Sequence, residues 1–266
     1  MKKNVLILKS IMIICLIINI SLIQAKESTK IVSTRFSDVE EIVINKGETK
    51  LVYSTIKLTA GNLKVKGNAK ELMEGEFKYP DLDLRPKADY SENTEIGTLN
   101  IELTKPNIDF DEDDQIEWDI LLNNDVAMDL TIKMGAGIGN FYLGELNLQD
   151  LDISAGAGDY FIDLRNSNVP QMMFKAGAGE ASIDLSGERT NSLNAEFTCG
   201  FGELKITLPR NIGVRVKISG LIGDVDYPGF IKDKNEYTND LFRKTETNID
   251  LEITAGMGEI DLMMTD

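Results

Sequence analysis

The sequence predicts an all-β fold, a β-solenoid built like a parallel β-helix from two-strand coils of about 21 residues each. The first observation is a signature of two glycines separated by one residue. It recurs at 134–137, 155–158, 176–179, 199–202 and 255–258. The first glycines of the first four copies lie 21, 21 and 23 residues apart. A fixed period of this length is typical of repeat proteins whose units bury their faces by stacking.

The second observation is period-2 alternation of apolar and polar residues on both sides of each signature, the pattern of half-buried strands. Each unit is therefore predicted to contain a strand, a glycine bend, a second strand and a return loop. Glycine suits the bend because it adopts positive φ and allows close backbone approach. An antiparallel meander is the alternative, but it would not require similar residues at equivalent positions. Residues expected to point inward include Ile162, Leu164, Phe174, Ile183, Leu185, Phe197, Leu204, Ile206 and Leu251.

The chain divides into three regions: a signal peptide over 1–25, an N-terminal β region over 26–115, and the regular glycine-repeat solenoid over 116–266. We expect the N-terminal region to add coils to the same stack rather than to form a separate domain. Its strands are predicted at 42–44 and 51–65, with a turn or strand approach at 71–74. The proline- and charge-rich stretch 80–97 reads as a loop. Later, 208–226 reads as a degenerate coil and 227–247 as an inserted loop before the last coil.

The first 25 residues have the order of a secretory signal. Lys2, Lys3 and Lys9 form a basic start, 11–18 is an unbroken apolar run, and Ala25 is a plausible cleavage position. An uncleaved anchor is the alternative, although the apolar run is shorter than the ~20 residues of a membrane-spanning helix. Cys15 follows an isoleucine where a lipoprotein signal has a small residue, so lipidation is disfavoured.

Composition narrows the function classes. The chain has 28 basic and 44 acidic residues, a net charge of −16, and no histidine. Removing 1–25 takes away three lysines and leaves 25 against 44, a net charge of −19. Such acidity disfavours binding to nucleic acid or anionic lipid and suits a cationic ligand, a basic partner or simple solubility. The absence of histidine excludes Ser-His and Cys-His catalysis and histidine-based metal centres.

Acidic residues directly follow the bend glycines, and stacked coils would place them in a column about 4.8 Å apart. This column is the candidate cation site, and a solvated polar corner is the favoured interpretation because a ladder alone does not make a cage of six to eight oxygens. Its members are Asp159, Glu180, Glu203, Asp224 and Glu259. The acidic run 109–114 is a second candidate for weak Ca²⁺ or basic-partner contact, with a solvated loop favoured.

Two single residues also have alternative interpretations. Trp118 could be a surface aromatic for sugar binding, but beside Ile116 and Ile120 it is more typical of core. Cys199 takes the same place as the alanine before the bend in other copies, so we expect a buried small residue rather than a reactive thiol. It is the one cysteine left after removal of 1–25.

Several sequence segments resemble those of a known family, the toast-rack proteins. These are bacterial envelope proteins with a domain of unknown function. The similar stretches are 58–67, 72–79, 118–122, the Gly-Ala-Gly copies, Leu208-Pro209 followed by Gly213-Val214, and 249–260. The resemblance covers nearly all of the chain after residue 25. It extends loosely to the C-terminal domain of a membrane regulator of the cell-wall antibiotic response. It implies a β-solenoid outside the cytoplasm and implies no reaction.

These observations favour a non-enzymatic exported scaffold or interaction module of the cell envelope, in the periplasm or at the cell surface, with modulation of envelope-stress sensing as a candidate role. No catalytic residue or cofactor is predicted. The expected partners are an envelope protein or cell-wall glycan, with no nucleic acid and no membrane insertion of the mature chain. The alternatives are a glycan-binding or glycan-active solenoid and a cation-binding surface protein. Arg215 and Lys217 read as isolated from a clear acid pair, which disfavours a glycan-cleaving site.

Overall fold

The computed structural model describes residues 38–105, 115–221 and 223–265 of the chain. The described part is almost entirely β-structure, with one 3-10 turn at Leu82–Leu84. The strands are β1 (Asp38–Ile44), β2 (Leu51–Lys66), β3 (Met73–Tyr79), β4 (Pro86–Asn93), β5 (Ile96–Leu103), β6 (Glu117–Leu122), β7 (Ala127–Tyr142), β8 (Leu148–Asp163), β9 (Gln171–Asp184), β10 (Leu193–Pro209), β11 (Gly213–Gly220), β12 (Asp224–Asp226), β13 (Ile231–Asp233), β14 (Glu236–Thr238) and β15 (Asn248–Thr265).

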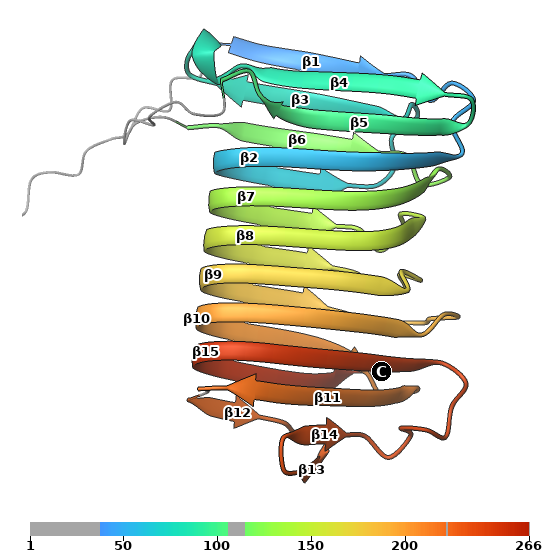
Figure 1. The fold of residues 1–266 in the computed structure, drawn as a ribbon, viewed down its shortest axis with the longest axis vertical. Coiled ribbons are helices and arrows are strands. Elements are labelled where there is room, and N and C mark those ends of the chain that lie inside the picture. Colours follow the sequence, from blue (N-terminus) through green and yellow to red (C-terminus); the bar gives the residue numbers. More distant parts are fainter. Residues whose placement is uncertain (1–37, 106–114, 222, 266) are drawn as a thin grey trace, which may run out of the picture. The chain divides into compact units, whose positions relative to one another are not determined.

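All of these strands belong to one sheet, and most of its pairings are parallel (Figure 1). The long strands β2, β7, β8, β9, β10 and β15 lie side by side in that order, and each pairs in parallel with the next. We call these six strands the stack. Parallel pairing rules out the antiparallel meander, because consecutive strands of a meander would run in opposite directions.

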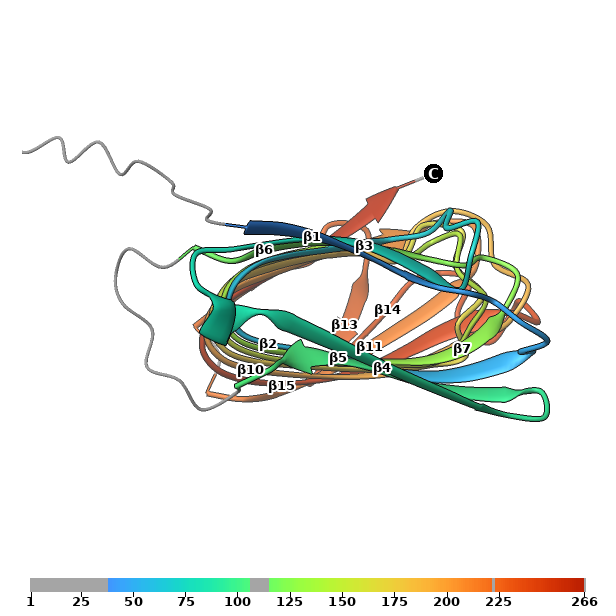
Figure 2. The same ribbon diagram turned by 90° about the horizontal axis from the view of Figure 1, so that it is seen from above.

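Each strand of the stack bends near its middle, and the pairing continues through the bend. Gly137, Gly158, Gly179 and Gly202 are successive partners in the register. The first bend glycine is skipped in the pairing, but the register has the same offset on both sides of it, so the two strands predicted for each unit form one continuous bent strand. Figure 2 shows that each long strand turns back at its bend, so that its two halves face each other. The first and second halves of each strand therefore belong to two facing walls.

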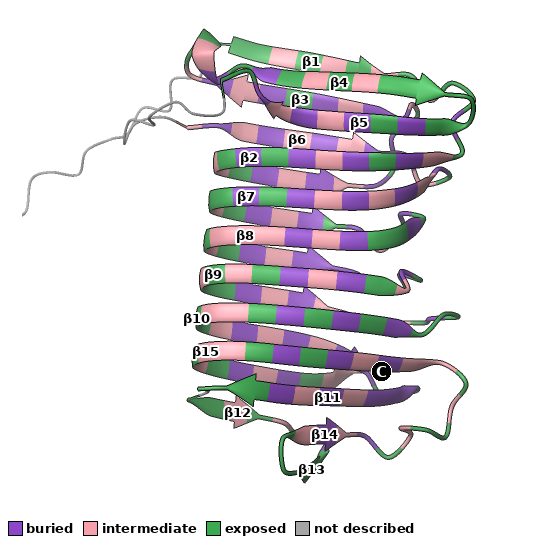
Figure 3. Ribbon diagram, viewed as in Figure 1, coloured by how far each residue is buried: buried purple, intermediate pink, exposed green. Residues whose placement is uncertain are grey.

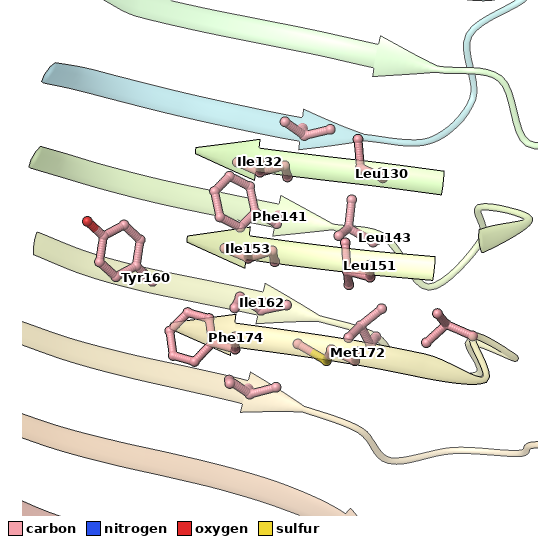
Figure 4. Packing of buried hydrophobic residues seen from close by; sticks show 14 of the residues in the cluster. Leu130, Ile132, Phe141, Leu143, Leu151, Ile153, Tyr160, Ile162, Met172 and Phe174 are labelled. Carbon is pink, nitrogen blue, oxygen red and sulfur yellow. The ribbon is translucent and has the colours of Figure 1, made fainter. Parts of the chain in front are cut away.

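The core lies between these two walls. Burial alternates along both halves of each strand (Figure 3), and Figure 4 shows side chains from the two halves directed toward one another. Aromatic contacts add to the packing, such as the edge-on pair Phe174–Phe197 with ring centroids 5.9 Å apart. The predicted inward register is confirmed, because every one of these residues is at most 2% exposed: Ile162, Leu164, Phe174, Ile183, Leu185, Phe197, Leu204, Ile206 and Leu251.

The interpretation of 80–97 as a loop was wrong. Residues 86–93 form β4, which pairs antiparallel with β5 across a turn at Thr94, whose φ is 61°. Pro86 is tolerated because it is the first residue of a strand that pairs on one side only. The charged side chains of β4 lie largely on its exposed face, so the composition that indicated a loop belongs to an edge strand. Within 227–247, β13 and β14 also form a short antiparallel hairpin.

The last strand is out of sequence order in the sheet. β15 pairs with β10 on one side and with β11 and β12 on the other, so the C-terminal strand lies between segments that are consecutive in sequence. The register is continuous, with Cys199 beside Ala255 and Ala255 beside Gly220. The hairpin of β13 and β14 then pairs with the outer edge of β11.

The physical reason given for the first glycine of each signature needs correction. Positive φ occurs at the second glycine, as in Gly158 (151°) and Gly179 (121°), and not at Gly156 or Gly177. The first glycine is constrained instead by its neighbour in the stack. A Cβ atom on Gly156 would overlap the carbonyl oxygen of Gly135, and one on Gly177 would lie 2.8 Å from that of Gly156. Close backbone approach therefore acts on both glycines, and positive φ acts on the second.

We predict that Gly179→Ala destabilises the protein far more than Gly229→Ala. Both residues have positive φ, but a Cβ on Gly179 would overlap the backbone of Gly158, whereas one on Gly229 would meet only the Met264 sulfur at 3.8 Å. We expect a loss of about 1–2 kcal/mol for Gly229→Ala from φ strain alone. For Gly179→Ala we expect about 3 kcal/mol or more, because the stack must shift. Urea unfolding measures both, and equal losses would contradict the role given to stacking.

Candidate functional site

The structure brings the predicted acidic column together. Asp159 pairs in register with Glu180, Glu180 with Glu203, and Glu203 with Glu259. Glu259 then pairs with Asp224 of β12. The order in space therefore differs from the order in sequence, because β15 lies between β10 and β12. The column follows the second bend glycine on the outside of the sheet, and on the β7 side it ends at Ile138.

The charges of the column are unequally compensated. Lys205 Nζ lies 2.6 Å from Glu203 Oε1 and is the nearest cation to that carboxylate. Glu180 has no lysine or arginine within 4 Å among the described residues, although it still raises the pKa of Lys205 together with the larger effect of Glu203. Within the described ranges no three carboxylates or thiols converge as a metal site would require. The column is thus a ladder of solvated carboxylates in geometry, and its affinity for cations stays untested.

A second polar surface lies on the wall formed by the first halves of the strands, and we call it the polar face. Outward residues at equivalent positions stack there: Asp129 beside Asp150, Gln171 beside Asn194, and Asn194 beside Asp250. A shallow cavity of about 330 Å³ opens on it. Its lining residues are Asp150, Asp152, Gln171, Met172, Met173, Asn194, Ala195, Glu196, Arg215, Asp250 and Glu252.

Charge is unevenly distributed across the polar face. The Asp150 side chain is exposed, but desolvation by the atoms around it raises its pKa, and the neighbouring carboxylates Asp129 and Asp152 raise it further. At the other end of the cavity, Arg215 Nη2 lies 2.6 Å from Asp250 Oδ2 and Nη1 lies 3.5 Å from Glu236. The carboxylates near β8 are therefore crowded, while those near β11 are neutralised by a guanidinium group.

Arg215 and Lys217 are predicted to be isolated from a clear acid pair, but each has an acidic neighbour in the structure. Arg215 pairs with Asp250, and Lys217 Nζ lies 3.2 Å from Glu252 Oε1. These pairs form because β15 is inserted beside β11, a neighbour relation that sequence order does not reveal. The polar face itself was missed. Its signal was available, since Asp150, Gln171 and Asn194 each precede their first bend glycine by six residues.

The other singled-out residues are structural where they are described. Trp118 is 1% exposed and packs edge-on against Phe77, with ring centroids 5.3 Å apart, so the core interpretation is confirmed. Cys199 lies in the ladder between Ala176 and Ala255 and is half-buried, so the expected full burial is met only in part. Burial raises its pKa to about 11. The acidic run 109–114 and the predicted signal 1–25 lie outside the described residues.

Families and solved structures can now be compared with this geometry. A family described as the N-terminal domain of toast_rack, DUF2154, matches residues 32–174, more than half of the chain. The chain belongs to the toast-rack family. The resemblance noted in the sequence is therefore confirmed, and the match extends from before β1 into β9. No protein with a curated function matched the sequence.

Solved structures resemble this toast-rack protein as well. A crystal structure of a "putative cell adhesion protein" from Clostridium sporogenes aligns with a TM-score of 0.65 at 25% identity, covering 86% of this chain and 99% of that chain. A "putative adhesin" from Bacteroides fragilis aligns with a TM-score of 0.31 at 12% identity, over 85% of this chain and 97% of that one. In the described part of the chain, no helix is both long and apolar enough to cross a membrane.

We predict that Glu180→Gln slightly stabilises the protein at low ionic strength. Glu180 lies between two other acidic residues of the column without an ion-pair partner, so removing its charge relieves repulsion worth a few tenths of a kcal/mol. The gain should fade in 0.5 M NaCl, where charges are screened within a few ångströms. Glu203→Gln is the matched control, because it also breaks the contact with Lys205 and should gain less. A Ca²⁺-specific rise in melting temperature that Glu180→Gln abolishes would instead assign a metal site to the column.

We predict that the Cys199 thiol is protected in the folded protein. In a Cys15→Ser background it is the sole thiol, and its reaction with a disulfide reagent at pH 8 should be slow until denaturant is added. Because burial raises the folded-state pKa from 9.0 to about 11, the folded protein holds the proton more tightly, and stability should fall as pH rises through this window. Fast modification without unfolding would contradict the protection that partial burial gives the thiol.

Proposed function

We propose that this toast-rack protein is a β-solenoid that works outside the cytoplasm as a non-enzymatic interaction module of the cell envelope. The observation that carries the proposal is the similarity to a "putative cell adhesion protein", which spans 99% of that chain with a TM-score of 0.65. The likeness to a "putative cell adhesion protein" over 86% of this chain supports a shared scaffold on which a binding surface could be built.

The in-register pairing of the long strands supports the solenoid part of the proposal. The partners Ala136, Ala157 and Ala178 each lie 21 residues apart, so one bent strand and its return loop make one repeat. Such a stack buries a continuous core and holds its outer side chains in fixed rows, which suits an extended binding surface.

The absence of catalysis is also a proposal. The carboxylate that an enzyme would most plausibly use is Asp150, because its raised pKa and its position in a shallow cavity resemble those of a general acid. The acids that face it, Asp129 and Asp152, raise the proton affinity of Asp150 but supply no cationic stabilisation. Arg215, at the other end of the cavity, is engaged by Asp250 and Glu236. This arrangement favours binding over bond cleavage.

Two measurements test the proposed function. Fractionation of cells that produce the full chain should place it in the envelope or outside the cell, with a mature mass that lacks about 25 residues, as expected for a cleaved secretory signal. Purified protein should bind envelope preparations saturably and show no turnover of acidic or neutral polysaccharides. Polysaccharide cleavage that Asp150→Asn abolishes, with folding intact, would overturn the non-enzymatic assignment. Retention in the cytoplasm would overturn the location.

A further inference from the structure

The sheet has open edges at both of its ends. Among the strands of the described residues, four pair on one side only: β1, β4, β12 and β13. Such edges present unpaired backbone groups and attract other strands unless they are short, charged or proline-bearing. β12 and β13 have three residues each, and β4 begins with Pro86 and carries Lys87 and Asp89. β1 is seven residues long and contains no proline or lysine; its charged residues are the acids Asp38, Glu40 and Glu41, which oppose an acidic strand but not a basic one.

The outward side chains of β1 are unusual for an unprotected edge. Val39 is 58% exposed and Val43 is 56% exposed, and Glu41 lies between them on the same face. In the register with β3, Val39 is beside Lys78, Glu41 beside Glu76, and Val43 beside Glu74. A groove of about 380 Å³ begins at Glu41 and Val43 and continues over the acids of β3. An apolar–acidic–apolar row therefore lines the open edge.

The acid in this row lacks a counter-charge. Glu76 is contacted by Lys78 Nζ at 2.9 Å, and Asp119 of β6 is contacted by Lys64 at 3.1 Å. Glu41 is the acid between the two exposed valines of β1. It has no lysine or arginine within 4 Å in the part of the chain that the structure describes. The inward-facing neighbour Glu40 is different, because Arg85 binds it at 2.6 Å and lowers its pKa. One exposed charge on β1 is thus left to be paired from outside the sheet.

We propose that β1 is a docking edge for a strand of a partner protein, and that the docked strand carries the outward pattern apolar, basic, apolar. Backbone hydrogen bonds would extend the sheet by β-strand addition. A lysine or arginine opposite Glu41 would complete the row of acids and bases, and apolar side chains would cover Val39 and Val43. This inference deepens the proposed interaction function by naming the surface and the chemistry of its partner.

A second copy of this chain fits the same edge poorly. Antiparallel pairing of two β1 strands centred on Glu41 would place valine opposite valine but would also place the two Glu41 carboxylates opposite each other. Like charges directly opposite destabilise strand pairs, and each chain carries a net charge of −16. The Glu41 carboxylate therefore disfavours pairing of two β1 strands and favours a partner strand with a basic residue. Specificity of this kind rests on repulsion of the wrong partner.

The test uses the full chain and two synthetic peptides. In both, every second residue is threonine, and the three residues between the threonines are valine–lysine–valine in one peptide and valine–glutamate–valine in the other. Binding is measured by fluorescence polarisation in 0.1 M NaCl. Wild-type protein should bind the lysine peptide about threefold to fivefold more tightly than the glutamate peptide, as expected for one cross-strand charge pair. Glu41→Lys should reverse this preference. A preference unchanged by Glu41→Lys would overturn the proposal.

Matched controls separate strand addition from general attraction to an acidic protein. Val43→Lys should weaken lysine-peptide binding at least threefold, whereas Ile231→Lys, at a side chain 60% exposed on the edge strand β13, should not. Peptide N-methylated along its bonding edge should lose binding. Hydrogen exchange should slow at Val39–Ile44 when peptide is added. Equal effects of the two lysine variants, or dimerisation of the wild type through β1, would contradict the proposal. These assays are done in solution and do not depend on where the protein lies in the cell. Peptide binding can therefore fail while the envelope location is confirmed, and peptide binding can succeed while the envelope location is refuted.

Discussion

The close approach of glycine backbones at the bend is the constraint on which the rest of this structure depends. At the bends of β7, β8, β9 and β10 the second glycine takes a conformation that side-chain-bearing residues avoid, and the carbonyl oxygen of the preceding strand occupies the space of a Cβ atom. Because neighbouring strands keep the same register offset on both sides of these positions, the two walls share one register. The core between the walls and the rows of side chains outside them both follow from that register.

The same register turns single residues into surfaces. An acidic residue after each bend becomes a column, and acids and amides six residues before the first glycine become the polar face. Insertion of β15 beside β11 then brings Arg215 to Asp250 and thereby neutralises one end of that face. At the β1 end no further strand of the described residues continues the sheet, so the edge that remains there is defined by Val39, Glu41 and Val43. The local sequence determines which side chains point outward, and the pairing of the strands determines which of them become neighbours.

Much of the fold could be predicted because it rests on short-range periodicity. Alternation around the glycines correctly placed Phe174 and Leu251 in the core, and the 21-residue spacing indicated which strands are neighbours. The position of β15 could not be predicted, since its neighbours are set by packing between segments far apart in sequence. For the same reason the ion pairs of Arg215 and Lys217 were missed. β4 was missed because an exposed edge strand and a loop have the same polar composition.

The central claim is that the long strands stack in one register with the C-terminal strand between β10 and β11. Paired cysteines test it most directly, in a background of Cys15→Ser and Cys199→Ala. Thr198 and Thr254 are register partners, and so are Thr254 and Ser219, which leaves Thr198 and Ser219 two strands apart. Neighbouring strands lie about 4.8 Å apart, within disulfide reach, and two strand spacings exceed it. Under mild oxidation, Thr198→Cys with Thr254→Cys should cross-link in the folded monomer, and Thr198→Cys with Ser219→Cys should not. The opposite result would place β11 beside β10 and contradict the account.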